Sequence, residues 1–443
     1  MNTFVRHMSR RSFLKLPALV PLTAFNSRFH SGEHHFQYEH IIGTSMDLVV
    51  WTQYSSVAEH ARHVVFEEVD RLASILNTRD PASEVSLLQN SDGHTPSRDL
   101  KEVLGAYDYW ERRTDGVFSI RPGGADTPRN VDALGKAYII DQAAKAVRQT
   151  TSAIDALLLN IGGDIVVWGQ SCEIAIADPD NWYDNATPIS TINLRNAAIA
   201  TSGTYARGAH LSDARTGQPL KTATAATVVA PNLVTANALA TTLCLTGTEY
   251  GLRLVESTPG AEAFRVAPGR VLQRTAGFAS LERPISIQKP EPTDWPPGYQ
   301  LTVTLPLTRG RSKERPYVAV WVEDSSGKLV RMLAFWGNKS KYYGDLSNAW
   351  GLVGRNQNRI RSVTRATRPP GKYELVWDGL DEQRKPVPLG TYRIGVETNQ
   401  EHGTYAKQSG TINLGESPTS ITLPATTNFD TVAVEYGPKQ NRR

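Results

Sequence analysis

The stretch TSGTYARGAHLSDARTG, residues 201–217, joins a turn of small residues to a single histidine, His210, and ends in an acidic turn that contains Asp213. Glycine lets backbone N–H groups approach an anion closely, because it has no Cβ to block the path, and neighbouring hydroxyls add further hydrogen bonds. This composition is typical of a phosphate-binding loop. The same residues are also compatible with two ordinary surface turns, so the rest of the chain must separate the two interpretations.

The composition limits the class of protein. A chain of 443 residues is long enough for two or three domains, each with its own hydrophobic core. The 48 basic and 44 acidic residues leave a net charge of +4 without a basic tract, so we expect no nucleic-acid partner. Cys172 and Cys244 lack the spacing of metal ligands. They are best interpreted as buried free thiols, with a single disulfide as the alternative.

The N-terminus has the pattern of an export signal. Residues 9–15, SRRSFLK, contain an arginine pair, and an apolar run follows over residues 16–25. The run is about half the length that a membrane span needs, so we expect no stable membrane span. We interpret residues 1–30 as a twin-arginine signal and predict a periplasmic protein exported by that route.

Hydrophobic spacing predicts an α+β domain with a mixed sheet over residues 36–284. Apolar residues three and four positions apart indicate helices over residues 57–75, 85–88, 100–113, 133–149 and 235–244. Short apolar or alternating runs indicate strands over residues 46–52, 156–160, 172–177, 189–194, 198–200 and 224–230.

A proline-rich linker over residues 285–298 separates this domain from a second one with period-2 patterning. Strands are expected over residues 299–305, 316–323, 329–336, 371–377, 391–397 and 410–414. They predict an all-β, immunoglobulin-like sandwich over residues 299–420, followed by a tail over residues 421–443.

Eight ordered blocks within residues 36–281 resemble the FAD:protein FMN transferases, the ApbE family. The blocks are GTSMDLVV, TDGVFSI, GKAYIIDQAAKAV, LLLNIGGDIVVWG, IAIADP, AIATSGTYAR, HLSDARTGQPL and TANALATTLCLTG. The resemblance implies that FAD is bound as a substrate with Mg²⁺. It also implies that FMN is transferred to a Thr or Ser hydroxyl of an acceptor protein carrying a flavinylation motif, with release of AMP. The second domain resembles an uncharacterised domain found behind such transferases.

The resemblance also implies roles for individual residues. It places Thr44, Ser119, Lys136, Asp141, Thr201, Ser202 and Gly203 at the flavin and its diphosphate, Gly135, Asn237 and Thr241 at the metal, and His210 and Asp213 in the chemistry. Asn237 and Thr241 are four residues apart, so on a helix they share one face and can point at one ion. Independently of the resemblance, Asn237 could cap its helix, and Thr241 could bond to the preceding helical turn.

Three departures from the family pattern leave a second function open. The family has an aspartate at the positions of Asn237 and Ser119 in this chain. The segment of residues 131–136 is also about two residues shorter than its counterpart in the family. The alternative is therefore a catalytically impaired flavin-binding or adaptor protein, for which Asn237→Asp would raise transfer. Carbohydrate or surface binding by the sandwich is a third possibility that rests on fold analogy alone. Residues 362–367 partly resemble the acceptor motif, so self-flavinylation at Thr367 is a further hypothesis.

Overall fold

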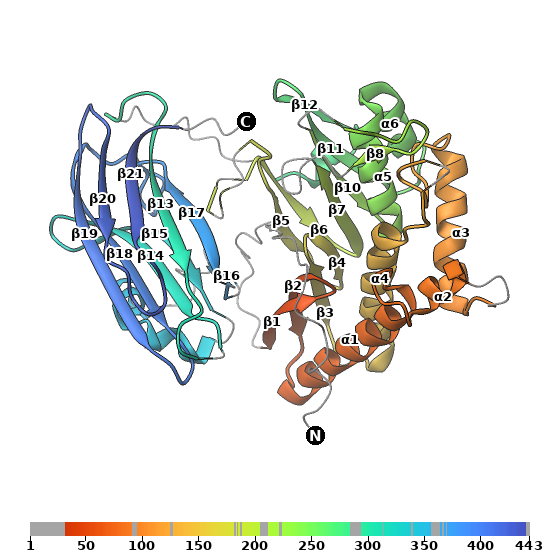
Figure 1. Cartoon of the computed structure of the whole chain (residues 1–443), viewed down its shortest axis with the longest axis horizontal. Coiled ribbons are helices and arrows are strands. Elements are labelled where there is room, and N and C mark those ends of the chain that lie inside the picture. Colours follow the sequence, from red (N-terminus) through yellow and green to blue (C-terminus); the bar gives the residue numbers. More distant parts are fainter. Residues whose placement is uncertain are drawn as a thin grey trace.

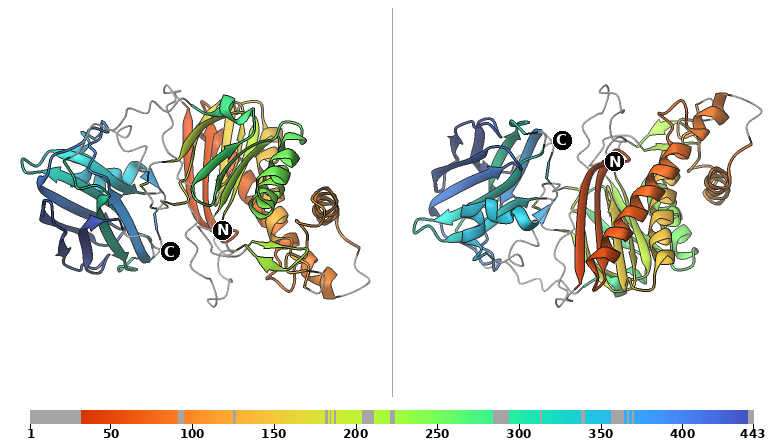
Figure 2. Two further views of the ribbon diagram at one scale, coloured as in Figure 1. Left: turned by 90° about the horizontal axis from the view of Figure 1, so that it is seen from above. Right: turned by 90° about the horizontal axis from the view of Figure 1, so that it is seen from below.

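The computed structural model describes residues 32–439 except 91–94, 125–126, 181–182, 184, 187, 204–210, 221–223, 284–293, 313, 338–339, 356–363, 366 and 369. The twin-arginine segment and most of the proline-rich linker lie outside these described residues. Two bodies follow each other along the chain, and Figures 1 and 2 show a helix-covered sheet beside an all-β sandwich.

The first body is built on one eight-stranded sheet. Its strands lie side by side in the order β1 (Glu33–Ile41), β2 (Thr44–Trp51), β3 (Ala156–Ile161), β4 (Asp164–Trp168), β7 (Ala197–Gly203), β10 (Ala225–Ala230), β11 (Glu262–Ala267) and β12 (Val271–Arg274). Every pairing in this sheet is antiparallel. The α+β class is therefore confirmed, but the expected mixed sheet is wrong. All but one of the described helices of this body lie in two excursions, from β2 to β3 and from β10 to β11, and each excursion returns the chain to the end of the sheet that it left.

Three long helices cover one face of the sheet: α1 (Ser55–Leu76), α4 (Asp132–Thr150) and α5 (Leu233–Thr246) (Figure 1). The shorter helices α2 (Glu84–Asn90), α3 (Arg98–Arg113), α6 (Thr248–Glu256) and α7 (Phe278–Leu281) complete the body. In α1 the spacing of Ala58, Ala61, Val65, Val69 and Leu72 puts all five on the buried side, as a 3.6-residue period requires. The opposite face of the sheet packs against the hairpin of β5 (Cys172–Ile176) and β6 (Ser190–Leu194).

The second body is a sandwich of two sheets, and its overall class agrees with the prediction. One sheet has the order β17 (Gly371–Trp377), β13 (Tyr299–Leu307), β21 (Val432–Pro438), β20 (Thr419–Leu423). The other has the order β16 (Thr364–Arg365), β15 (Leu329–Trp336), β14 (Tyr317–Asp324), β18 (Gly390–Asn399), β19 (Tyr405–Leu414). The short helices η1 (Ser340–Asp345) and α8 (Ser347–Leu352) pack on the outer face of the second sheet.

The structure corrects the prediction of a tail over residues 421–443. Strand β21 lies between β13 and β20, and Val432, Val434 and Tyr436 belong to the buried core of the sandwich. Val432, Val434 and Tyr436 alternate as in a half-buried strand, but the run is short and ends at Gly437 and Pro438, which are unfavourable residue types in strands.

The structure also describes the two cysteines and the contact between the two bodies. Cys172 and Cys244 are buried free thiols, as predicted. No helix among the described residues is long and apolar enough to cross a membrane. The two bodies touch where the Asn185 side chain hydrogen-bonds the backbone of Val376 in β17, with the Val376 N–H donating to Asn185 Oδ1 at 3.0 Å.

Candidate functional site

Helix α5 is fixed at its N-terminus by two side chains. The oxygen of Asn232 accepts the N–H of Thr235 at 2.8 Å, which makes Asn232 the N-cap. Asp141, on the neighbouring helix α4, accepts the N–H of Leu233 with both carboxylate oxygens, at 3.0 and 2.9 Å, and the N–H of Val234 at 3.2 Å. Asp141 therefore anchors α5 to α4 instead of presenting a free carboxylate to a ligand.

Burial raises the pKa of Asp141 to about 6, and the negative charge of Asp164 adds to the effect. The N–H groups of Leu233 and Val234 act in the opposite direction, because they stabilise the ionised form. Asp164, whose charge contributes to this shift, begins β4 at the turn between β3 and β4.

At that turn, two of the predicted flavin-side residues, Lys136 and Thr44, both lie against Gly162. Lys136 Nζ lies 2.8 Å from Asp164 Oδ2 and 3.5 Å from the carbonyl oxygen of Gly162. Both side chains of this ion pair are largely buried, with 19% of Lys136 and 9% of Asp164 exposed. The Thr44 side chain lies against Gly162, since a Cβ there would come within 2.6 Å of it. Asn160 fixes the same turn by accepting the N–H of Gly163 at 2.9 Å.

Two pairs of hydroxyl groups connect β7 to its neighbours. Ser202 Oγ lies 3.0 Å from Thr241 Oγ1 on α5, and Thr201 Oγ1 lies 2.9 Å from Thr227 Oγ1 on β10. The Cys244 thiol donates to the carbonyl oxygen of Ser202 at 3.1 Å. Gly203 is buried at the end of β7, so all three residues of the predicted phosphate-binding turn belong to a strand.

Asn237 provides the most informative atom of the site. It lies inside α5, one turn before Thr241, and Asn232 occupies the cap position, so the capping role that the sequence left open for Asn237 is excluded. Its Oδ1 atom is buried and has no hydrogen-bond partner among the described residues. A buried polar atom without a partner is costly unless a ligand or water satisfies it. Gly135, the third predicted metal residue, is buried in the first turn of α4, beside Lys136.

These oxygens suit a hard divalent cation such as Mg²⁺, which prefers amide, hydroxyl and carbonyl oxygens. Asn237 Oδ1, which has no partner within the described part of the chain, can serve as a ligand of such an ion. Within the described ranges, no group of three His, Cys, Asp or Glu side chains is arranged to hold a metal. The amide of Asn237 and the hydroxyl of Thr241 carry no formal charge, so these residues fit a weak, largely neutral cation site.

The two residues predicted for the chemistry lie on or before a small hairpin. His210 lies outside the described residues. Asp213 belongs to β8 (Ser212–Asp213), which pairs with β9 (Gln218–Pro219). Its carboxylate forms an ion pair of 2.6 Å with Arg215, and the hydrogen bond from Arg215 lowers the pKa of Asp213 below its usual value. Asp213 thus holds the turn in shape and stays ionised at neutral pH.

The hairpin packs on the segment that contains Ser119. The N–H of Ala214 donates to the carbonyl oxygen of Val117 at 3.2 Å. Ser119 Oγ accepts the N–H of Arg121 at 3.1 Å. This segment is joined to the start of α4 by Tyr107, whose hydroxyl accepts the N–H of Leu134 at 3.2 Å and whose ring stacks on Phe118.

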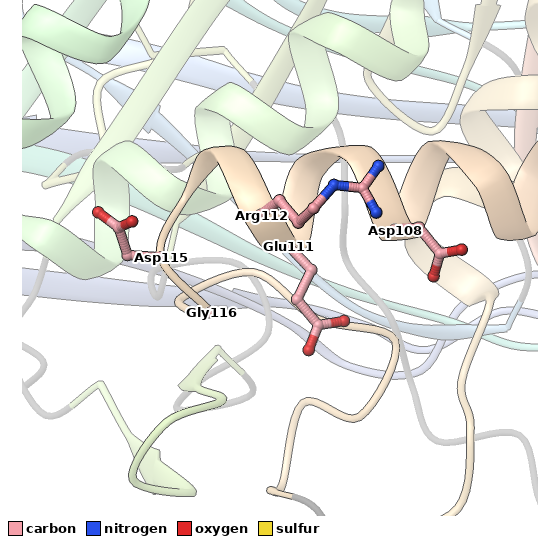
Figure 3. A pocket seen from close by; sticks show the side chains of 5 residues that line it. All are labelled: Asp108, Glu111, Arg112, Asp115 and Gly116. Atoms are coloured by element: carbon pink, nitrogen blue, oxygen red, sulfur yellow. The ribbon is translucent and has the colours of Figure 1, made fainter.

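Beside this segment lies a surface hollow of about 420 Å³ (Figure 3). It is lined by Asp108, Glu111, Arg112, Asp115 and Gly116, and includes none of the predicted site residues. Tyr250 donates a hydrogen bond of 3.0 Å to Asp115, and the Arg215 side chain packs on Gly116. The hollow is therefore next to the hairpin but separate from the α4–α5–β7 site.

Three residues that hold site residues in place were not predicted from the sequence: Asp164, the counter-ion of Lys136; Asn160, which fixes the β3–β4 turn; and Thr227, which bonds to Thr201. Asp164 had a usable signal, because a carboxylate directly after a buried strand and two glycines must find a partner. The proposed acceptor Thr367 is 1% exposed, so its hydroxyl is not accessible to another active site.

Comparison with known proteins identifies two family segments. Residues 124–265 match the ApbE family, and residues 298–431 match a family described as predicted periplasmic protein (DUF2271). The first segment contains the residues of α4, α5 and β7 that form the site. Residues 124–265 are thus similar to the ApbE family, and residues 298–431 are similar to the DUF2271 family.

The curated relatives are named FAD:protein FMN transferase. One from Treponema pallidum is 26% identical over 174 residues, covering 35% of this chain and 48% of that protein. One from Haemophilus influenzae is 30% identical over 168 residues, covering 34% of this chain and 48% of that protein. The chain spans about half the length of these relatives.

Among solved structures, the ApbE protein of Thermotoga maritima aligns with a TM-score of 0.49 and 19% identity, over 57% of this chain and 99% of that one. The apo form of the flavinyl transferase ApbE of Pseudomonas stutzeri aligns with a TM-score of 0.47 and 18% identity, over 58% of this chain and 100% of that one.

Proposed function

We propose that this protein is an FAD:protein FMN transferase of the periplasm, which transfers FMN from FAD to a Thr or Ser hydroxyl of an exported acceptor protein. The observation that carries the proposal is the contact of Ser202 with Thr241 on the helix that also carries Asn237, within a segment that matches the ApbE family; Asn237 Oδ1 has no partner among the described residues. A buried, unsatisfied oxygen beside clustered hydroxyls is the arrangement expected of a site that awaits a charged ligand.

The reaction is a phosphoryl transfer. The acceptor hydroxyl oxygen forms a new bond to the FMN phosphorus, and the bond from that phosphorus to the bridging oxygen of the diphosphate breaks. AMP leaves with the bridging oxygen, and the hydroxyl proton passes to a base. Such reactions depend mainly on alignment and on neutralising the charge of the diphosphate.

In this proposal Asn237, Thr241 and the carbonyl of Gly135 hold Mg²⁺. The bound ion supplies charge neutralisation at the diphosphate. His210 is the base for the acceptor hydroxyl, since an imidazole titrates near neutral pH. Asp213 keeps the hairpin that follows His210 in shape through its ion pair with Arg215.

On the flavin side, Thr44, Lys136 and Ser119 contact the isoalloxazine and its linker, and residues 201–203 line the diphosphate. Asp141 is better described as the anchor of α5 than as a flavin contact, because its carboxylate is already bonded to Leu233 and Val234. The match of residues 298–431 to a predicted periplasmic family supports the assigned compartment, and twin-arginine export remains part of the proposal.

A second candidate is a flavin-binding or adaptor protein with impaired transfer. The neutral Asn237 favours it, because loss of a carboxylate ligand weakens a magnesium site. In this case the protein binds FAD but transfers FMN slowly, and Asn237→Asp restores transfer.

In-gel flavin fluorescence of an acceptor peptide, incubated with FAD, Mg²⁺ and the full chain, distinguishes these functions. Mg²⁺-dependent labelling that is lost in His210→Ala but kept in His63→Ala, an exposed histidine on α1, supports the transferase. FAD binding without labelling in the wild type, and labelling in Asn237→Asp, supports the second candidate. The absence of both binding and labelling contradicts the two proposals together.

A further inference from the structure

We infer that Ser202, Asn237 and Thr241 form a neutral oxygen cradle that holds a divalent cation only together with a diphosphate, with Ser202 as a further ligand. The inference rests on the proposed function, because it concerns the metal and the diphosphate of that same site. It predicts that each of the two ligands raises the affinity for the other.

The cradle carries no formal charge of its own. The three side chains contribute an amide oxygen and two hydroxyls, none of which carries a formal charge at neutral pH. Mg²⁺ gives up its water reluctantly and is usually held by one or two carboxylates plus substrate phosphates. Without a carboxylate, the negative charge must come from the substrate.

Two carboxylates, one at the start of α5 and one in the β3–β4 turn, are already engaged. Asp141 is bonded to the N–H groups at the start of α5, and Asp164 is paired with Lys136 at 2.8 Å. Moving either carboxylate to an ion would leave the α5 terminus or the buried Lys136 ammonium without its partner. Such a loss of a buried partner is strongly unfavourable.

The spacing of the Ser202 and Thr241 hydroxyl groups also suits a single ion. Ser202 Oγ and Thr241 Oγ1 are 3.0 Å apart. Two adjacent ligands of an octahedral Mg²⁺, each about 2.0–2.1 Å from the ion, are separated by about 2.9–3.0 Å. The two hydroxyls thus already have the separation of two neighbouring ligands, and Asn237 lies one helical turn from Thr241 on the same face of α5.

Thermodynamic linkage makes the mutual dependence of the cation and the diphosphate measurable. If a diphosphate raises the affinity for the cation by some factor, the cation must raise the affinity for the diphosphate by the same factor. We expect a factor of at least ten, because the diphosphate supplies the charge that the cradle lacks.

The test is titration of the full chain with Mn²⁺, followed by electron paramagnetic resonance of the free ion, with and without FAD. We expect Mn²⁺ to bind the wild type at least tenfold more tightly with FAD than without it. Asn237→Asp should increase the affinity for Mn²⁺ without FAD at least tenfold, because it restores a charged ligand.

Ser202→Ala tests the additional ligand, and Thr227→Val is the matched control, because it removes a hydroxyl that bonds to the adjacent Thr201. Ser202→Ala should lower the Mn²⁺ affinity of the FAD complex at least fivefold, and should lower FAD affinity in EDTA by a smaller factor. Thr227→Val should change neither value by more than twofold.

Tight Mn²⁺ binding to the wild type without FAD, unchanged by Asn237→Asp, would overturn the inference and leave the transferase proposal standing. Equal Mn²⁺ affinities for Ser202→Ala and Thr227→Val would remove Ser202 from the cradle. Failure of the wild type to bind FAD at all would contradict both the inference and the proposed function.

Discussion

Asp141 on α4 holds Leu233, the first residue of α5, by hydrogen bonds from one backbone N–H to both carboxylate oxygens, at 3.0 and 2.9 Å. This contact determines where α5 begins relative to α4, and with it the height of Asn237 and Thr241 above the sheet. A residue that family resemblance associates with the flavin therefore acts through the helix that carries the candidate metal ligands.

Asp141→Asn should change the pH dependence of stability. The pKa of Asp141 in the folded protein is about 6, above its ordinary value of 3.8, so the folded state binds this proton more tightly than the unfolded chain does. The contribution of Asp141 to stability is therefore largest in acid and is lost as the pH rises through about 4 to 6, by at most about 1.4 kcal/mol per pH unit.

Urea unfolding of both proteins between pH 4 and 8 measures this effect. The free energy of unfolding of Asp141→Asn minus that of the wild type should rise with pH up to about 6 and then level off. A difference that stays constant with pH would show that Asp141 titrates normally.

Lys136→Met should destabilise the protein by about 3–5 kcal/mol, because it leaves the buried Asp164 carboxylate without its partner. The double variant Lys136→Met/Asp164→Asn should recover most of this loss. Chemical denaturation of the two single variants and the double variant gives the coupling energy. Additive effects of the two substitutions would argue against a buried ion pair.

Gly162→Ala and Gly43→Ala form a matched pair at the Thr44 end of the site. Both glycines have a positive φ, but a Cβ on Gly162 would lie 2.6 Å from the Thr44 side chain, whereas a Cβ on Gly43 meets nothing within 4 Å. Gly43→Ala should cost about 1–2 kcal/mol from backbone strain alone. Gly162→Ala should cost about 1–3 kcal/mol more and also weaken FAD binding, since overpacking displaces Thr44. Equal losses in both variants would contradict the contact.

Truncation after residue 430 should unfold the sandwich, because it removes β21 from between β13 and β20. Truncation after residue 438 keeps β21 and should leave the thermal transition of the sandwich unchanged. Calorimetry and proteolysis of the two truncated chains check this. A folded sandwich in the shorter chain would show that β21 is dispensable.

The sequence predicts strongly periodic elements well and spatial partners poorly. The apolar spacing of α1 and the buried run of β3 both lie within two residues of their expected bounds. Strand β21 escaped detection because its strand character depends on pairing with β13, more than 120 residues earlier in the chain. The expectation of a mixed sheet was also wrong. Residue patterns do not show at which end of the sheet the chain returns from a run of helices, and that end decides whether the next strand is parallel or antiparallel.

In the site, too, the sequence indicates the residue types but not their spatial partners. Resemblance identified Lys136, Ser202, Asn237 and Thr241, whose residue types carry the motif. It did not predict that Asp141 would bond to α5 or that Asp164 would neutralise Lys136, because these partners are set by how α4 packs against α5 and the β3–β4 turn. His210 lies outside the described residues, and its role stays a prediction.

The central claim is transfer of FMN to an acceptor hydroxyl, and intact-mass spectrometry of an acceptor peptide measures it most directly. After incubation with the full chain, FAD and Mg²⁺, we expect the peptide to gain the mass of one FMN, AMP to appear in equal amount, and EDTA to abolish both. A peptide of unchanged mass after incubation with FAD-loaded wild type and with Asn237→Asp would contradict the account.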